Sequence, residues 1–475
     1  MQENQKITPT SFVIFGATGD LFRRKLAPSL FNLFMSGRLP EFFRIVAFSR
    51  RPWRDAEFRE FLREELRSKI VDADHEIIEQ FLEKIFYLEG AFDRTESYRE
   101  VARLLARFDE EAGVCMNKLL YLATPPSFYE LILFNISGSG LSIACAPVKD
   151  GNDSGWVRVL IEKPFGRDAM SANQIELMLA KLFSESQIFR IDHYLAKETL
   201  KNILTFRFAD GVFEPFWNKR FIDRVEVKLF EKDGIGNRGA LYDGLGALRD
   251  VGQNHMLQMV ALIAMENSES FETIAVRKSR AEAIKKFRIF SSVGVPILVR
   301  GQYEGFRAEP GVIFNSKTET YFKVSVAVSG TRWRGVPFIL EGGKGMNESK
   351  VEIVVRFKKP VGVNIAGESV LVEWVKFKIQ PKEAITINCP LRNQPEFSFP
   401  LSLNKPSNNF KSDIRKKSLD AYERVLLDAI LGDQTLFAST EEVKAEWKII
   451  GAILRKWGNT ELIKYPKGTI PQHNS

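Results

Sequence analysis

The stretch "SFVIFGATGDLFRRK", residues 11–25, determines the fold expected for the first part of the chain. An apolar strand runs into Gly16, and Gly19 precedes a helical pattern over residues 21–37. Glycines between a strand and a helix let the backbone turn sharply and approach a pyrophosphate, which then meets the amides at the helix N-terminus. Phe22 occupies the position of the third glycine of the dinucleotide-binding fingerprint, so the local packing must differ from the usual one.

Strands and helices continue to alternate beyond this loop. Near-continuous apolar runs predict strands, and an amphipathic pattern opened by an acid predicts a helix. The strands are expected at 44–50, 118–127 and 156–166, and the helix at 55–70. Apolar strands between helices are typical of a parallel sheet covered on both faces. The sequence therefore predicts an α/β Rossmann-type dinucleotide-binding domain over residues 1–190.

The remaining residues, 191–475, follow a different pattern. Several segments alternate with period two and are rich in β-branched residues, which is typical of an antiparallel sheet with one less buried face. These segments are 224–232, 321–330, 350–359, 371–380 and 384–391, and helices are expected at 420–432 and 439–457. The sequence predicts a C-terminal α+β domain with a large, mostly antiparallel sheet.

The end of the second strand indicates which dinucleotide binds. NAD-binding folds usually carry an Asp or Glu there, which holds the ribose hydroxyls. This chain has "AFSRR", residues 47–51, and the guanidinium of Arg50 suits a 2′-phosphate. We therefore expect NADP as the cofactor, with NAD as a weaker alternative.

Two of the four histidines, His193 and His255, lie inside dense polar motifs. His193 belongs to "FRIDHYLAKE", residues 189–198. If this segment is helical, His193 and Lys197 share a face of the helix. Together with Tyr194 they would form a phosphate clamp.

His255 lies where a polar, glycine-bearing segment enters a strongly apolar helix. A histidine at such an edge can be partly desolvated and act as a general base near neutral pH. Asp250 precedes His255 on the same segment, but the two would lie about 140° apart on an ideal α-helix. An orienting carboxylate from another segment is therefore favoured, and Asp192 is available.

Over nearly its whole length the chain resembles glucose-6-phosphate dehydrogenase. The stretches that carry the resemblance occur in order along the sequence: "GATGDLFRRKLAPSLFNL", "YLATPPS", "IEKPFGRD", "RIDHYLAKE", "RFADGVFEPFWNKRFID", "GALRDVGQNHMLQM", "TETYFK", "GVPFILEGGKGMNE" and "DAYERVLLDAILGDQTLF". The most specific is "RIDHYLAKE", which differs from the usual form only by Ala196, where the family has glycine.

The resemblance implies oxidation of glucose 6-phosphate at C1 to 6-phosphogluconolactone, with hydride transfer to NADP. This reaction is the first step of the oxidative pentose phosphate pathway. The resemblance assigns His193, Tyr194 and Lys197 to the sugar phosphate. It assigns the general base to His255 and the orientation of that base to Asp192.

The same matching extends to further residues. Those expected at the substrate are Lys163, Glu231, Asp250, Lys344 and Ser349. Those expected at the nucleotide are Gly16, Ala17, Thr18, Gly19, Asp20, Leu21, Arg23, Lys25, Arg50, Tyr129 and again Lys163. The resemblance also implies that Pro164 is cis.

The chain departs from the family at the sugar site. The family usually has a basic residue at the position of Ser349 and an arginine at that of Glu341. Either Lys350 replaces the missing cation, or the site works without it. We favour the second outcome, with Lys350 facing away, because neighbouring residues on a strand point to opposite faces.

The composition restricts the partners and the compartment. The net charge is +8, but the cations are scattered and no window combines them with exposed aromatics, so no nucleic acid is expected. The longest apolar helical run, residues 256–265, is too short to span a membrane. Cys115, Cys145 and Cys389 lack CxxC spacing, which argues against a disulfide framework or a metal site.

We therefore expect a reducing, cytoplasmic compartment, and the N-terminus carries no signal-peptide pattern. By the resemblance, the partners are glucose 6-phosphate, NADP and further copies of the chain, joined through the large sheet as a homodimer or tetramer. The alternative function is a catalytically silent NADP-binding sensor of the same fold.

Overall fold

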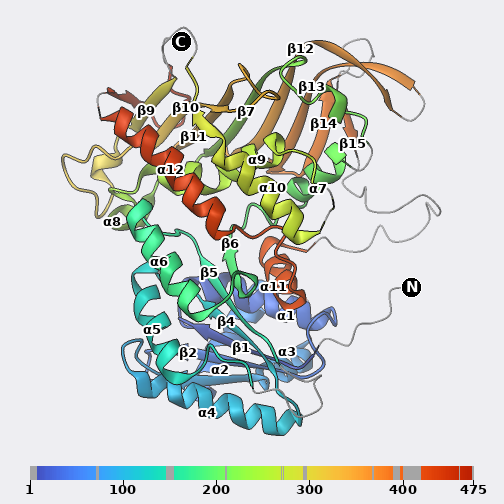
Figure 1. Cartoon of the computed structure of the whole chain (residues 1–475). Coiled ribbons are helices and arrows are strands. Elements are labelled where there is room, and N and C mark those ends of the chain that lie inside the picture. Colours follow the sequence, from blue (N-terminus) through green and yellow to red (C-terminus); the bar gives the residue numbers. More distant parts are fainter. Residues whose placement is uncertain are drawn as a thin grey trace. The chain divides into compact units, whose positions relative to one another are not determined.

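The computed structural model of the chain consists of two compact units (Figure 1). The described residues are 8–70, 74–145, 155–208, 211–268, 270, 272–291, 297–365, 368–388, 396–399, 419–458 and 460–472. Unit 1 comprises Met1–Gly166, Met170–His193 and Lys416–Thr440, and unit 2 comprises Arg167–Ala169, Tyr194–Arg415 and Glu441–Ser475. The sequence analysis placed all residues after 190 in the second domain. In the structure, Lys416–Thr440 pack with unit 1 instead.

Unit 1 is built on a parallel sheet. Its strands within the described residues are β1 (Thr10–Phe15), β2 (Phe43–Ser49), β3 (Ile85–Glu89), β4 (Asn117–Leu122), β5 (Val157–Glu162) and β6 (Ile188–Ile191). Their order is β3-β2-β1-β4-β5-β6, and each neighbouring pair is parallel. This is the strand order of doubly wound dinucleotide-binding folds, so the predicted fold class is confirmed for this unit.

Helices cover both faces of this sheet, as the apolar strands require. They include η1 (Phe22–Leu26), α1 (Ala27–Met35), α2 (Asp55–Lys69), α3 (His75–Leu82), α4 (Thr95–Ala112), α5 (Tyr129–Ser139), α6 (Ala169–Leu182) and α11 (Ala421–Leu431). In α2 the buried residues Phe58, Leu62 and Leu66 recur every four residues and form one apolar face.

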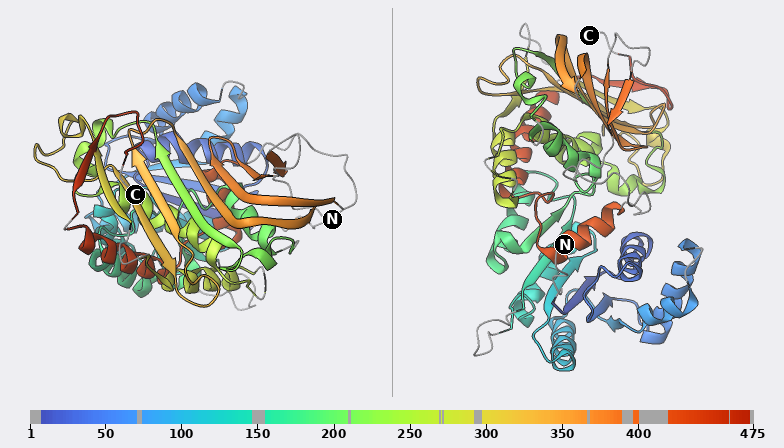
Figure 2. Two further views of the ribbon diagram at one scale, coloured as in Figure 1. Left: turned by 90° about the horizontal axis from the view of Figure 1, so that it is seen from above. Right: turned by 90° about the vertical axis from the view of Figure 1, so that its right-hand side faces the viewer.

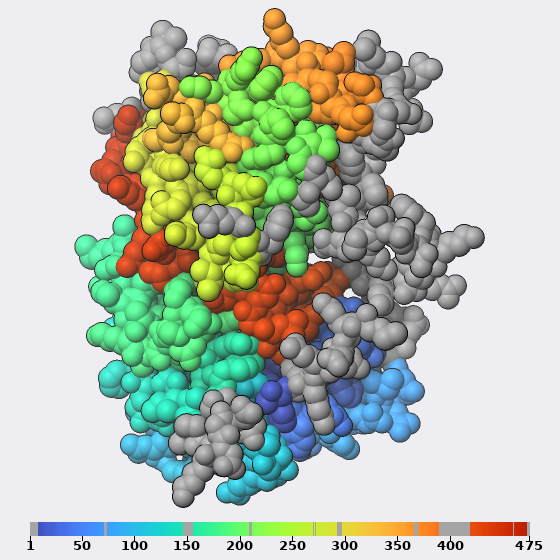
Figure 3. All heavy atoms as spheres, turned by 45° about the vertical axis from the view of Figure 1, so that its right-hand side comes forward, coloured from blue at the N-terminus to red at the C-terminus, as the bar shows by residue number. Residues whose placement is uncertain are grey.

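Helix α11 packs on unit 1 although it lies far downstream in the sequence. Its Glu423 accepts a hydrogen bond of 2.6 Å from Asn32 of α1. In Figure 3 the orange-red surface of this segment adjoins the blue surface of the N-terminal residues. The C-terminal part of the chain thus completes the nucleotide-binding unit.

Unit 2 is built on a mixed, mostly antiparallel sheet (Figure 2, left). Its strands within the described residues are β7 (Ile222–Glu231), β8 (Phe287–Ile289), β9 (Leu298–Tyr303), β10 (Tyr321–Val328), β11 (Phe338–Lys344), β12 (Lys350–Ile365), β13 (Glu368–Gln380), β14 (Ala384–Asn388), β15 (Glu396–Phe399) and β16 (Leu462–Tyr465). The order is β15-β14-β13-β12-β7-β11-β10-β9-β16, with β8 paired to β10. Among the described strand pairs of this sheet, only β7–β11 and β9–β16 are parallel. The prediction of a mostly antiparallel sheet is therefore confirmed.

Alternation explains how this sheet packs. In β7 the side chains of Val225, Val227 and Leu229 are buried, whereas the residues between them are partly exposed. Helices lie against one face of the sheet (Figure 1). They include α7 (Glu198–Phe208), α8 (Gly239–Tyr242), η6 (Leu248–Met256), α9 (Leu257–Ala264), α10 (Thr273–Lys285) and α12 (Thr440–Trp457). None of the helices in the described parts of the chain is long and apolar enough to cross a membrane.

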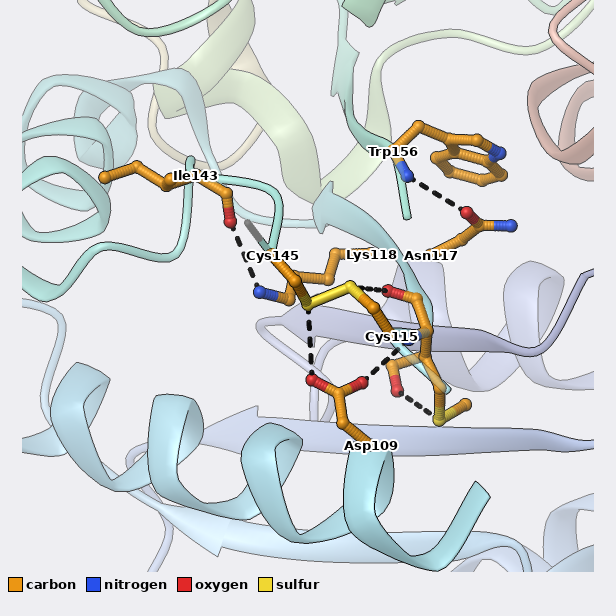
Figure 4. The surroundings of a disulfide bond; sticks show 9 residues. Asp109, Cys115, Asn117, Lys118, Ile143, Cys145 and Trp156 are labelled. Atoms are coloured by element: carbon orange, nitrogen blue, oxygen red, sulfur yellow. Dashed lines mark hydrogen bonds between the residues drawn. A yellow bond between two sulfur atoms is a disulfide. The ribbon is translucent and has the colours of Figure 1, made fainter. Parts of the chain in front are cut away.

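The cysteines are the first correction to the sequence analysis. Cys115, just before β4, forms a disulfide with Cys145, which follows α5 (Figure 4). Their Cα atoms are 6.1 Å apart, and Cys145 Sγ lies 3.6 Å from Asp109 Oδ2. The prediction was wrong because the two cysteines are separated by 30 positions and meet only through the tertiary fold. The inference from cysteine spacing to a reducing compartment therefore loses its premise. Cys389 lies outside the described residues.

Candidate active site

The glycine loop of unit 1 lies where β1 and β4 end. Gly16 has a φ of 90°, and a Cβ there would lie 2.6 Å from the carbonyl oxygen of Ala123. Only glycine therefore fits this position. The amide of Gly19 donates to the carbonyl of Gly16 at 2.9 Å, which closes a tight turn into the following helix. The loop lies at the point where the strand order reverses, which is where doubly wound folds bind dinucleotides.

The helix after the loop begins as a π-turn, η1, rather than as a regular α-helix. Phe22, at the missing glycine position, is buried, and its ring stacks on that of Phe58 in α2 with centroids 6.1 Å apart. Arg23 binds Asp20 at 2.9 Å and Glu65 at 2.8 Å. The helix changes from π to α geometry at the start of α1, whose first turn contains Pro28.

Arg50 follows β2 and is exposed. Its guanidinium carbon lies 5.6 Å from the ring centroid of Phe92 and 5.4 Å from that of Phe128. These distances are within the range of cation–π attraction, so two rings hold the charge at the rim of the sheet. Next to it, the hydroxyls of Thr18 and Ser49 are hydrogen-bonded at 2.6 Å. The glycine loop and the end of β2 are therefore joined directly.

A partly buried carboxyl lies at the end of β5, next to Lys163. Glu162 accepts a hydrogen bond of 2.6 Å from the hydroxyl of Tyr121, and burial raises the pKa of Glu162 to about 7. Tyr129, expected at the nucleotide, is fully buried and donates to the carbonyl oxygen of Glu162 at 2.8 Å. The Lys163–Pro164 peptide bond is cis, as the resemblance implied. Glu162 was not predicted as a site residue from the sequence, where the available signal was an acid at the end of an apolar strand.

The segment after β6 does not have the helical conformation that would place His193 and Lys197 on one face. Residues 192–197 form a turn, and α7 begins only at Glu198. The amide of Lys197 donates to the carbonyl of Tyr194 at 2.9 Å, a bond between residues three apart, as in a turn. His193 and Lys197 therefore do not share a helical face. In unit 1, Asp192 is 3% exposed, and in unit 2 Tyr194 is 8% exposed.

Unit 2 holds a charge cluster around the buried Lys344, where β7 and β11 end side by side. The parallel register pairs Lys344 with Glu231, and the Lys344 ammonium donates to the Glu231 carboxylate. The same ammonium lies 3.1 Å from Asp250 Oδ2. Burial of Lys344 opposes its charge, but the carboxylates of Asp250 and Glu231 outweigh this and raise the pKa of Lys344. The ring of Tyr242, which the sequence analysis overlooked, lies 5.5 Å from the ammonium.

The candidate base, His255, lies on a π-helix. Helix η6 carries both Asp250 and His255, and the His255 ring centroid is 4.3 Å from that of Tyr194. His255 is 1% exposed. A π-helix bonds residues five apart, so the angle calculated for an ideal α-helix does not apply to Asp250 and His255. Helix geometry therefore does not exclude Asp250 as the carboxylate that orients His255. In this structure, however, the carboxylate of Asp250 contacts Lys344.

Helix η6 is anchored at its start by a further buried acid that the analysis overlooked. Glu319 accepts a hydrogen bond of 3.2 Å from the amide of Leu248. A Cβ on Gly246 would lie 2.2 Å from the Glu319 carboxylate, so this neighbour must be glycine. Burial raises the pKa of Glu319 to about 7. The only sequence signal was the position of Glu319 inside the "TETYFK" stretch.

The departures from the family pattern have local partners. The Ser349 hydroxyl accepts a hydrogen bond of 2.9 Å from the amide of Lys232. The ammonium of Lys350 lies 2.6 Å from Glu348 and 3.8 Å from Glu352. Two glutamates thus balance the charge of Lys350. The second departure, Glu341, is buried and accepts a hydrogen bond of 2.8 Å from the hydroxyl of Tyr321.

A doubly wound nucleotide-binding unit, with a second unit that carries a buried histidine and a lysine–carboxylate cluster, defines a dinucleotide-dependent oxidoreductase. The family models "Glucose-6-phosphate dehydrogenase, NAD binding domain" and "Glucose-6-phosphate dehydrogenase, C-terminal domain" match residues 13–202 and 204–474. The chain belongs to the glucose-6-phosphate dehydrogenase family.

Full-length relatives agree with this assignment. The chain is 35% identical to the glucose-6-phosphate 1-dehydrogenase of Borreliella burgdorferi, over 98% of this chain and 96% of the relative. It is 38% identical to that of Aggregatibacter actinomycetemcomitans, over 96% and 93%. A solved structure of glucose-6-phosphate dehydrogenase in complex with glucose-6-phosphate matches with a TM-score of 0.83 and 30% identity, over 98% of this chain and 95% of that one.

The chain is therefore an enzyme of the pentose phosphate pathway that oxidises glucose 6-phosphate at C1. Its N-terminal domain is of the dinucleotide-binding type, so a dinucleotide accepts the hydride.

Proposed function

We propose that NADP is the preferred hydride acceptor and that Arg50 binds its 2′-phosphate. The support is the exposed guanidinium of Arg50, which Phe92 and Phe128 hold beside the glycine loop. A delocalised, permanently charged group suits a phosphate monoester. The residues of the loop itself, Gly16 to Leu21, would place backbone amides at the pyrophosphate, with Arg23 and Lys25 nearby. Kinetics with NADP and NAD as alternative acceptors test this preference.

In the proposed reaction His255 takes the proton of the C1 hydroxyl as hydride leaves C1. The dinucleotide, when bound, would supply the hydride acceptor for the C1 hydrogen, and C1–O would become the lactone carbonyl. Asp192 would orient His255 and stabilise its charged form after proton transfer. The support is the burial of His255 on a helix whose start is anchored, since a base held out of water keeps one orientation.

We propose that the lysine–carboxylate cluster of unit 2 binds the sugar. Lys344 would donate to a sugar oxygen, and Glu231 and Asp250 would accept hydrogens from sugar hydroxyls. The observation that carries this is the close approach of the three charges at the joint end of β7 and β11. His193, Tyr194 and Lys197 would bind the phosphate, and Lys163 would contact both sugar and nucleotide. Isothermal titration of glucose 6-phosphate into Glu231→Gln and Lys344→Ala tests the cluster.

We further propose that the site functions without a cation at Ser349. The two glutamates that hold Lys350 support this proposal, because moving its ammonium toward the phosphate would break both ion pairs.

We propose that the chain forms a homodimer or tetramer through the large sheet, as the resemblance implies, and that it functions in the cytoplasm. Light scattering on the purified protein measures the oligomeric state. The family assignment goes against the alternative function, a catalytically silent NADP-binding sensor, which would bind both ligands without reducing the dinucleotide.

A further inference from the structure

We infer that the C-terminal strand β16 positions the substrate-binding lysine, and that Tyr465 is a positioning residue for Lys344. This inference rests on the role of Lys344 proposed above. Tyr465 ends β16, which the sequence analysis did not connect with any function. Its side chain is 1% exposed, inside an aromatic cluster with Tyr303 and Tyr321.

The backbone of Lys344 is held from two sides. Its amide donates to the carbonyl of Thr320 at 2.8 Å. Its carbonyl accepts a hydrogen bond of 2.7 Å from the hydroxyl of Tyr465. The lysine is the last residue of β11, and the amides of Gly345 and Met346 that follow it donate to the carbonyls of Asp233 and Glu231 at 3.0 Å each. The Tyr465 hydroxyl supplies the hydrogen bond to the carbonyl of Lys344 itself.

The contacts of the Tyr465 hydroxyl determine which group donates and which accepts in each of its hydrogen bonds. The hydroxyls of Tyr465 and Thr320 are 2.9 Å apart, and the proton of Tyr465 goes to Lys344. Thr320 must therefore donate to Tyr465, and its own oxygen accepts from the amide of Tyr303 at 2.9 Å. Burial raises the pKa of Tyr465, so its hydroxyl keeps the proton that it donates. A buried chain of bonds thus runs from Thr320 through Tyr465 to Lys344.

The tail beyond β16 fastens the next residue of the loop. The amide of Gly468 donates to the carbonyl of Gly345 at 2.7 Å. Gly345 has a φ of 66°, and a Cβ there would lie 3.2 Å from side-chain atoms of Lys467 and Tyr303. The tail and the lysine loop are therefore in close contact.

This anchoring affects binding more than chemistry. The Lys344 ammonium reaches Glu231 and Asp250, so a shift of its backbone displaces the donor from the sugar. The proposed base, His255, lies on η6, and the hydroxyl of Tyr465 does not contact that helix in any described hydrogen bond. Loss of this hydroxyl should therefore raise KM for glucose 6-phosphate and leave kcat nearly unchanged.

The test is steady-state kinetics of Tyr465→Phe, which keeps the ring and removes the hydroxyl. We expect a KM for glucose 6-phosphate about three- to tenfold higher, the value of one buried hydrogen bond, with kcat within about twofold of the wild type. The KM for the dinucleotide should not change. Ser325→Ala is the matched control, because it removes a buried hydroxyl that donates to the carbonyl of Phe290 in the same sheet. It should leave both constants unchanged.

A second set of variants separates positioning from general stability. Thr320→Val removes the donor to Tyr465 and should raise the same KM, whereas Thr320→Ser should restore it. Thr320→Val combined with Tyr465→Phe should be less than additive, because both break one chain of bonds. If Tyr465→Phe does not fold, the Thr320 pair carries the test.

The inference would be overturned if Tyr465→Phe kept the wild-type KM, even with a lower melting temperature. If Tyr465→Phe does not fold, a wild-type KM in Thr320→Val would overturn it instead. Lys344→Ala, measured alongside, shows which claim failed. If Lys344→Ala itself keeps the wild-type KM, the proposed role of Lys344 is wrong. If it raises KM and Tyr465→Phe does not, only the positioning role is wrong.

Discussion

Arg50 in unit 1 and Lys344 in unit 2 are both cations expected to meet a ligand, yet their surroundings differ. Arg50 is exposed and rests on two phenyl rings. Lys344 is 3% exposed, and two carboxylates share its ammonium. An exposed cation can be removed without leaving a buried charge, whereas removing the carboxylates around the buried Lys344 leaves its ammonium uncompensated. Changes at the nucleotide rim should therefore alter affinity alone, and changes in the sugar cluster should alter affinity and stability together.

The largest effect is expected in unit 2 at His255. His255→Asn keeps the shape of the side chain and removes the base, so kcat should fall at least about 10²–10⁴-fold with a modest change in substrate binding. Steady-state kinetics measure this, with circular dichroism as the control for folding. A variant that retains more than a tenth of the wild-type kcat would exclude His255 as the base.

The next effect belongs to unit 1. Arg50→Ala should weaken NADP roughly ten- to a hundredfold and spare NAD, because only NADP offers the 2′-phosphate. The melting temperature should stay at the wild-type value, in keeping with the exposed position of Arg50. Equal weakening of NADP and NAD would show that Arg50 does not bind the 2′-phosphate.

A pH effect on stability should appear in both units. The pKa of Glu162 rises from 4.5 to about 7 on folding through burial, so between these values the folded state holds a proton that the unfolded chain has lost. The contribution of Glu162 to the free energy of unfolding is greatest below pH 4.5 and is lost as the pH rises through about 7. Glu162→Gln should therefore flatten the fall of the melting temperature over this interval, and Glu319→Gln should do the same for unit 2. The control is Glu64→Gln, at an exposed site on α2. A pH dependence unchanged by Glu162→Gln would contradict the account.

The smallest effect concerns the departure at Ser349. Ser349→Lys should lower KM for glucose 6-phosphate by less than about fivefold, since an exposed ion pair contributes little, and the gain should shrink as salt rises. Lys350→Ala should do little. A large rise of KM in Lys350→Ala, with no change in Ser349→Lys, would mean that Lys350 had taken over the contact.

The sheet of unit 1 could be predicted because a local signal specifies it. Each parallel strand is an apolar run between helices, and β1 and β2 begin within one residue of the expected positions. Phe22 illustrates the limit of such a signal. The sequence indicated that packing must differ there, but only the fold shows its ring against Phe58.

The local conformations that were not predicted are ones that the hydrophobic pattern does not distinguish. The π-helix η6 was missed because the hydrophobic pattern of a short helix does not separate π from α geometry, and the relation of Asp250 to His255 changed with it. A helical conformation was considered for the segment that contains His193 and Lys197, but residues 192–197 form a turn and α7 begins only at Glu198.

Contacts between distant segments could not be predicted from local patterns at all. The approach of Lys344 to Glu231 depends on the parallel register of β11 and β7. The Cys115–Cys145 disulfide depends on the path of the chain after α5. Residue matching to the family named Lys344 and Glu231 as substrate contacts, but it gave no indication that they touch each other.

One assay tests the central claim most directly. The purified chain is given glucose 6-phosphate with either NADP or NAD, and formation of the reduced nicotinamide is followed by absorbance. The account predicts reduction of the dinucleotide with a higher kcat/KM for NADP than for NAD. Binding of both ligands without reduction, or a higher kcat/KM for NAD, would contradict it.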